Sequence, residues 1–157
     1  MQKITTFLWY DDRAEEAARL YTSLFPDSRI TGTTRYSDVG PGEPGTVMTV
    51  EFELAGQRYT ALNGGPVFHF TEAVSLQVDC ADQAEVDRLW TALLVDGGEE
   101  SQCGWLKDRF GLSWQIVPRV LTELIADPDR AKADRVMAAM LQMRKIEIQP
   151  LLDAARG

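Results

Sequence analysis

The chain has 157 residues, of which 45% are hydrophobic and 25% charged, and its formal net charge is −8. This length can bury a core without disulfide or metal staples, so we expect one domain over residues 1–157. The acid excess disfavours a nucleic-acid partner, because such binding depends on Lys and Arg at phosphates. No apolar run approaches the roughly 20 residues that span a bilayer, which predicts no membrane partner. With two cysteines and no secretory leader at residues 1–3, the sequence favours a reduced, cytoplasmic protein.

The first part of the chain, residues 1–66, predicts a strand, a helix and three more strands. Residues 4–10 are rich in Thr, Phe, Trp and Tyr, which favour strands. Asp11 or Asp12 can cap a helix that carries an apolar stripe to about Leu24. The three later strands are predicted at residues 28–37, 46–54 and 58–63. These elements make up a first module.

The second part, residues 72–118, repeats this order in fewer residues. A strand is predicted at residues 74–80, and Asp82 can cap a helix to about Val95. Three short strands are predicted at residues 99–102, 104–107 and 112–117. The two helices also share a sequence: Arg19-Leu20-Tyr21-Thr22-Ser23-Leu24 recurs as Arg88-Leu89-Trp90-Thr91-Ala92-Leu93. A repeat of about half the chain predicts a fold built from two copies of one module.

The last part, residues 119–157, is predicted to be helical. A short helix is expected at residues 120–125. Asp127 followed by Pro128 combines an N-cap with proline at the first helical position, and this helix should reach Met143. A third helical segment is expected at residues 146–155.

Three motifs carry a resemblance to a known family. They are Phe7-Leu8-Trp9-Tyr10-Asp11, Leu62-Asn63-Gly64-Gly65-Pro66, and the sixteen-residue run at positions 103–118 that begins Cys103-Gly104-Trp105. The motifs resemble the 3-demethylubiquinone methyltransferase-like branch, also described as phosphonate-operon B-like, of the glyoxalase/bleomycin-resistance (vicinal-oxygen-chelate) superfamily. The tail also resembles this branch, at Asp127-Pro128-Asp129-Arg130 and at Met143 followed by Lys145-Ile146. The resemblance implies an α+β fold of two βαβββ modules plus C-terminal helices. It also implies clefts built from paired modules, either within one chain or across a homodimer.

The resemblance also marks positions for a metal site. Metal-dependent members of the superfamily take His, Gln or Glu ligands from the first and last strands of each module. By register, these positions are Thr5 or Thr6, Asn63, Ser75 and Gln115. Hydroxyls and primary amides are weak donors to a divalent ion, and four neutral groups would leave its charge uncompensated. The single histidine, His69, lies in the connector between the modules, so we expect no metal and no other cofactor.

Further cleft candidates follow from strand alternation and from aromatic lining. Alternation places Ser113 and Gln115 on one face of the last strand, and Ser75 and Gln77 on one face of an earlier strand. Trp9 and Trp105 can line a hydrophobic mouth, although each can instead belong to the core. Lys107 can hold an anionic group or belong to a solvated turn. Cys103 is a weaker candidate for a nucleophile, because no histidine lies near it in the sequence.

These residues favour a protein that binds a small organic metabolite in a metal-poor cleft between βαβββ modules. No catalytic residue is assigned. One alternative is a metal-dependent isomerase, lyase or dioxygenase of the vicinal-oxygen-chelate type. Another is a methyltransferase-like activity, although no glycine-rich loop opens a helix here as a methyl-donor site usually requires. A domain with only a structural or partner-binding role is a further alternative.

Overall fold

A computed structural model describes residues 2–157. The chain divides between Phe70 and Thr71 into two compact units, which are taken one at a time below. Across the described residues, every helix is too short or too polar to cross a bilayer.

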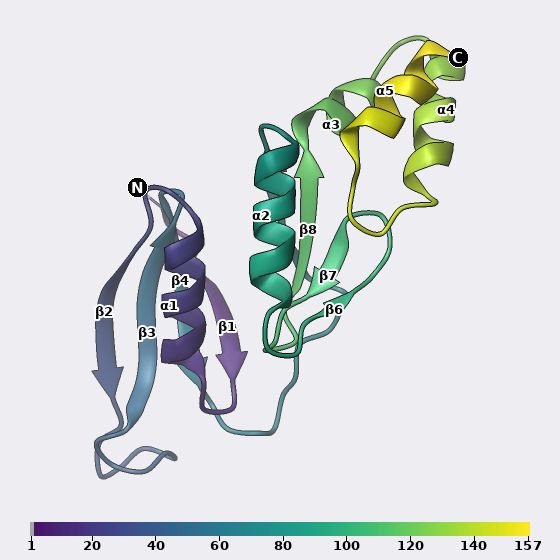
Figure 1. Ribbon diagram of the computed structural model, residues 1–157. Helices are drawn as coiled ribbons and strands as arrows, with labels where there is room; N and C mark the ends of the chain where they lie inside the picture. The colour runs from purple at the N-terminus through teal and green to yellow at the C-terminus, as the bar shows by residue number, and fades with distance from the viewer. Residues whose placement is uncertain (1) are drawn as a thin grey trace. The chain divides into compact units, whose positions relative to one another are not determined.

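The first unit is a four-stranded sheet covered by one helix (Figure 1). Its strands are β1 (Thr6–Tyr10), β2 (Arg29–Arg35), β3 (Val47–Leu54) and β4 (Gln57–Asn63), in the order β1-β4-β3-β2. The pair β1 and β4 is parallel, and the other two pairs are antiparallel. Helix α1 (Ala14–Leu24) buries Ala14, Ala17, Ala18 and Tyr21. These positions recur at intervals of three and four, so one stripe of the helix faces the sheet, where the Tyr21 ring lies 6.3 Å from that of Phe52.

The second unit contains the same arrangement. Its strands are β5 (Ser75–Cys80), β6 (Glu99–Glu100), β7 (Trp105–Lys107) and β8 (Ser113–Pro118), in the order β5-β8-β7-β6. Here β5 and β8 form the parallel pair. Helix α2 (Gln83–Leu94) has Asp82 as its N-cap, as predicted. The Asp82 side chain accepts a hydrogen bond from the Glu85 N–H. The matching strand orders confirm the α+β fold of two βαβββ modules.

The C-terminal extension consists of α3 (Arg119–Ile125), α4 (Arg130–Met140) and α5 (Ile148–Arg156). Leu121, Val136, Ile146 and Leu151 form a small core between these helices. The extension is also fastened to the sheet of the second unit. The backbone N–H groups of Cys103 and Gly104 donate to the carbonyls of Met143 and Arg144, at 2.8 and 2.7 Å.

Several predicted boundaries are wrong, and three of them have a physical reason in the structure. The first strand begins at Thr6, because Ile4 is 83% exposed and outside the ladder. Neither Asp11 nor Asp12 caps α1. The N–H of Ala14, the first residue of the helix, instead donates to the side chain of Asn63 at the end of β4.

The third error concerns α4, which begins at Arg130 and not directly after Asp127. The Asp129 side chain accepts a hydrogen bond from the Lys132 N–H and caps this helix. The helix ends at Met140, three residues before Met143. The Met143 N–H donates to the Met140 carbonyl and closes a tight turn that ends the helix. The Met143 carbonyl then accepts the hydrogen bond from the Cys103 N–H.

Candidate functional site

A pocket of about 470 Å³ lies within the second unit, between its sheet and the C-terminal helices. Strand alternation puts Gln115 and Val117 on the sheet face opposite the buried Trp114 and Ile116, so the pocket lies on the face turned away from α2. It is lined by Gln77, Cys103, Trp105, Gln115, Val117, Leu121, Thr122, Ile125, Ala126 and Met140.

The floor of this pocket is a short row of side chains on three neighbouring strands. Gln77 of β5 pairs with Gln115 of β8, and Gln115 pairs with Trp105 of β7. Gln115 donates through Nε2 to the Ser75 Oγ at 2.9 Å. Its Oε1 therefore remains as the acceptor that Gln115 can offer to a ligand. The floor combines two primary amides with one flat indole surface.

The walls of the pocket come from the C-terminal extension. Leu121 and Ile125 of α3 and Met140 of α4 supply apolar surface, and all three also belong to the hydrophobic cluster of the extension. The rim includes Cys103, a free and partly exposed cysteine in the left-handed region with φ 58°. The N–H that this residue donates to Met143 holds it in that conformation.

The ten lining residues are all uncharged. A charged ligand would lose its hydration here without gaining an ionic partner, so the pocket favours a neutral molecule. The donors also fit a divalent ion poorly, since two amides, a hydroxyl and a single thiol lack the imidazole and carboxylate groups of such sites. Throughout residues 2–157, His, Cys, Asp and Glu side chains do not gather in a group of three that could hold a metal ion.

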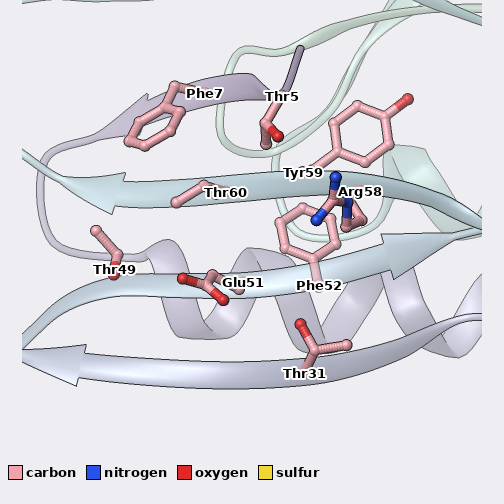
Figure 2. A pocket seen from close by; sticks show the side chains of 9 residues that line it. All are labelled: Thr5, Phe7, Thr31, Thr49, Glu51, Phe52, Arg58, Tyr59 and Thr60. Carbon is pink, nitrogen blue, oxygen red and sulfur yellow. The ribbon is translucent and has the colours of Figure 1, made fainter. Parts of the chain in front are cut away.

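One cavity of the first unit has a volume of about 280 Å³ and a different lining. Figure 2 shows Phe7, Thr60 and Glu51 on the neighbouring strands β1, β4 and β3, where Thr60 pairs with both of the other residues. Arg58 and further threonines complete this surface. The site therefore contains a carboxylate, a guanidinium and several hydroxyls, which suits a more polar ligand than the pocket of the second unit.

The structure places the predicted residues of the first unit in three different settings. Thr5 lines the cavity of Figure 2, whereas Thr6 lies one position further along the chain, on the opposite side of β1. Trp9 donates its indole N–H to the Gly65 carbonyl at 2.9 Å, and its ring lies 4.9 Å from that of Phe68. A Cβ on Gly64 would approach the Trp9 ring to 2.3 Å, so a glycine is needed at this turn.

Asn63 is held by contacts within the fold of the first unit. Its Oδ1 accepts a hydrogen bond from the Ala14 N–H at 2.8 Å, and its Nδ2 donates to the Val47 carbonyl at 3.1 Å. One amide thus fixes the start of α1 and the end of β4. Asn63 also lines a pocket of about 650 Å³ within the first unit, which is separate from the pocket that contains Gln115.

The remaining predicted residues lie in the second unit. Gln77, Trp105 and Gln115 meet in the pocket, and Ser75 orients Gln115. Ser113 is 1% exposed, and no described residue forms a hydrogen bond with its Oγ. It does not line the pocket.

Lys107 also lies outside the pocket and forms an ion pair with Glu72. The hydrogen bond between the two side chains lowers the pKa of Glu72 and raises that of Lys107. Both charges therefore persist near neutral pH.

Two groups of residues that build these sites could not be identified from the sequence. The pocket walls, Leu121, Ile125 and Met140, lie in helices that look from their sequence like ordinary packing elements. Glu51 lies in the middle of an alternating strand. A side chain of either kind becomes a site residue only through its neighbours from distant parts of the chain.

Comparisons with known proteins agree with this architecture. The family model described as 3-demethylubiquinone-9 3-methyltransferase matches residues 2–117. The PhnB protein from Bacillus cereus is 40% identical, with a TM-score of 0.68, and the likeness covers 74% of this chain and 99% of that chain.

Two more distant structures show the fold alone. Protein PA1353 from Pseudomonas aeruginosa is 19% identical with a TM-score of 0.61, covering 75% of this chain and 98% of that chain. The fosfomycin resistance protein FosX from Mesorhizobium loti is 16% identical with a TM-score of 0.56, covering 81% and 100%. No curated protein matches the chain. The chain belongs to the 3-demethylubiquinone-9 3-methyltransferase family, whose PhnB-like members have the vicinal-oxygen-chelate fold.

Proposed function

We propose that the second unit binds a small organic molecule in the pocket above its sheet, without a metal ion. The observation that supports this most directly is the side-by-side placement of Gln77, Gln115 and Trp105 beneath an apolar wall. Ligand pockets are typically apolar with a few well-placed polar groups, and their volumes run from roughly 300 to 1,000 Å³. The volume of about 470 Å³ lies in that range.

The floor suggests how such a ligand would lie. A planar ring can stack on the Trp105 indole, while an amide, carbonyl or hydroxyl group pairs with the amides of Gln77 and Gln115. Because Ser75 fixes the Nε2 end of Gln115, that side chain enters the pocket already oriented. Less side-chain entropy is then lost on binding.

The description of the family raises methyl transfer as another activity. S-adenosylmethionine carries a sulfonium cation and a charged amino-acid group, and the uncharged lining of this pocket offers neither of them an ionic partner. We therefore expect no micromolar binding of S-adenosylmethionine in calorimetry. Binding of that strength would favour methyl transfer and count against our proposal.

Cys103 provides a direct test, because its thiol lines the pocket while Cys80 is buried. The full-length protein would be treated with N-ethylmaleimide, with and without millimolar benzamide, acetanilide or phenylacetamide, and labelling followed by intact mass. We expect a saturable slowing of Cys103 labelling that persists in EDTA. A Cys103→Ser variant should take up almost no label.

A matched pair of variants assigns the protection to the pocket floor. Gln77→Met removes an exposed amide of the floor, and Gln142→Met removes an exposed amide elsewhere. The first change should weaken protection about fivefold, in line with about 1 kcal/mol for one hydrogen bond, and the second should leave it unchanged. If none of the three probes slows the labelling, or if EDTA abolishes the effect, the proposal is wrong.

A further inference from the structure

The C-terminal extension lies outside the part of the chain that the family model matches. That match ends at residue 117, whereas α3 begins at Arg119. Five of the ten pocket residues belong to this extension or to the turn after α3: Leu121, Thr122, Ile125, Ala126 and Met140. The sheet floor thus lies within the region that the family model matches, while the wall facing it is supplied by a segment beyond that match.

This wall is held firmly in place. On one side, the carbonyls of Met143 and Arg144 accept hydrogen bonds from Cys103 and Gly104. Gly104 has φ +86°, and a Cβ there would lie 3.0 Å from the Ile116 carbonyl oxygen and 3.1 Å from the Ile146 side chain, so the close approach of the extension at this point needs glycine.

On the other side, the Gln83 amide holds the segment that leads into α5. It donates to the Ile146 carbonyl at 3.0 Å and accepts from the Ile148 N–H at 2.7 Å. Lys145 pairs with Asp87 at 2.8 Å, and Arg119 pairs with Asp79 at 2.9 Å. These links join the extension to β5 and α2 as well as to the loop at Cys103.

We infer that the C-terminal extension determines which class of ligand this site accepts, and that Met140 and Thr122 are specificity-determining residues. The inference rests on the proposed function of the same pocket. Met140 presents an uncharged apolar surface from α4, packed on the core of the extension, and Thr122 presents a hydroxyl from the exposed side of α3. A wall without charge opposite a floor of amides selects a neutral molecule with an apolar body and one polar end.

A change of charge in the wall tests this inference. The full-length protein and a Met140→Lys variant would be compared for the affinities of benzamide and benzoate, by protection of Cys103. Lysine has nearly the length of methionine and can keep its ammonium group near the pocket opening. The wild type should bind benzamide more tightly than benzoate. In the variant, the ratio of the two affinities should shift toward benzoate by about tenfold, because the lysine adds one ionic partner in a partly dry site.

Leu141→Lys is the matched control, because Leu141 is the next residue, is 55% exposed and does not line the pocket. It should leave the ratio as in the wild type. Circular dichroism establishes that each variant is folded, and Thr122→Lys provides the same charge from an exposed position if Met140→Lys does not fold.

The outcomes separate the two proposals. If neither benzamide, acetanilide, phenylacetamide nor benzoate protects Cys103 in the wild type, the proposed function fails. If the wild type binds benzamide while folded Met140→Lys or Thr122→Lys shows the wild-type ratio, only the role of the extension is overturned. An equal shift in Leu141→Lys would overturn it as well, because the effect would then be one of overall charge.

Discussion

A single amide side chain in the first unit and a single carboxylate in the second each hold several backbone or side-chain groups in place. Asn63 joins β4 to the start of α1 and to β3, and Asp108 holds a turn beneath Trp114. Both residues lie in motifs that mark the family, yet the contacts of each are structural. In this chain, a residue that is distinctive in the sequence is not for that reason a ligand of the site.

Replacement of Asn63 with Ala should destabilise the protein by about 2 kcal/mol, because the first turn of α1 and the Val47 carbonyl each lose a partner. Urea unfolding would measure the loss. The labelling of Cys103 should remain protected by benzamide, because Asn63 lies outside that pocket. Asn63→Asp keeps the acceptor for Ala14 and should show a smaller loss. Normal stability with lost protection would instead assign Asn63 to ligand binding.

Asp108 is 2% exposed, and its carboxylate accepts hydrogen bonds from groups of three residues that follow it. Oδ1 accepts from the N–H groups of Phe110 and Leu112, and Oδ2 accepts from the Trp114 indole. Asp108→Ala should therefore lower the free energy of unfolding by about 3 kcal/mol or more, since buried donors lose their partners. Asp134→Ala, at an exposed position of α4, should change it by less than about 0.5 kcal/mol. Similar values for the two variants would contradict this role of Asp108.

At the scale of elements, the hairpin between β3 and β4 is a tight turn made with one unfavourable residue. Ala55 and Gly56, the two residues between the strands, have φ 49° and 80°. Positive φ at both positions is typical of a type I′ turn, in which Asn-Gly is strongly preferred and alanine is strained.

Ala55→Asn should therefore stabilise the protein by about 1 kcal/mol. The Ala55 backbone N–H, which donates to the Ser28 Oγ at 3.0 Å, is kept by this change. Thermal unfolding would detect the gain as a raised Tm. Ala131→Asn in α4 is the control, and it should lower stability because asparagine is a poorer helix former than alanine. A lowered Tm for Ala55→Asn would show that the turn does not favour asparagine.

The order of elements followed well from the sequence, whereas several ends did not. Alternation and apolar periodicity depend on neighbours close in the chain, so they identified β1 to β4 and α1 in the correct order. The start of α1 depends instead on Asn63, which is remote in sequence from Ala14. At α4, two aspartates compete, and Asp129 is the cap because Asp127 turns toward the Asp129 N–H and Lys132.

At the scale of the whole molecule, the two cysteines differ in a way that can be measured by pH. Burial, with a smaller contribution from the charge of Glu85, raises the pKa of Cys80 from 9.0 to about 12. The unfolded chain therefore loses this thiol proton at a lower pH than the folded protein. The contribution of Cys80 to stability is complete below pH 9 and is lost as the pH rises toward 12.

The free energy of unfolding, measured in urea between pH 8 and pH 10.5, should thus fall more steeply for the wild type than for Cys80→Ala. The difference between the two slopes should approach about 1.4 kcal/mol per pH unit above the ordinary thiol pKa. Cys103→Ala, at a partly exposed cysteine, serves as the control and should keep the wild-type slope. Parallel curves for the wild type and Cys80→Ala would contradict this explanation.

The sequence by itself determined the two-module α+β fold, because hydrophobic periodicity, a helix repeat and three family motifs are all local patterns in the chain. It also indicated Gln77 and Gln115, since strand alternation fixes which side chains share a face, and Trp105 as an aromatic that could line a cleft. Association into a homodimer stays a prediction.

Only the tertiary structure decided that these three residues meet under Leu121, Ile125 and Met140, and that Asn63 belongs to the packing of α1. A pocket requires side chains from segments far apart in the chain to come within a few ångströms of one another. Local patterns specify how each segment folds, but not the distance between its side chains and those of another segment.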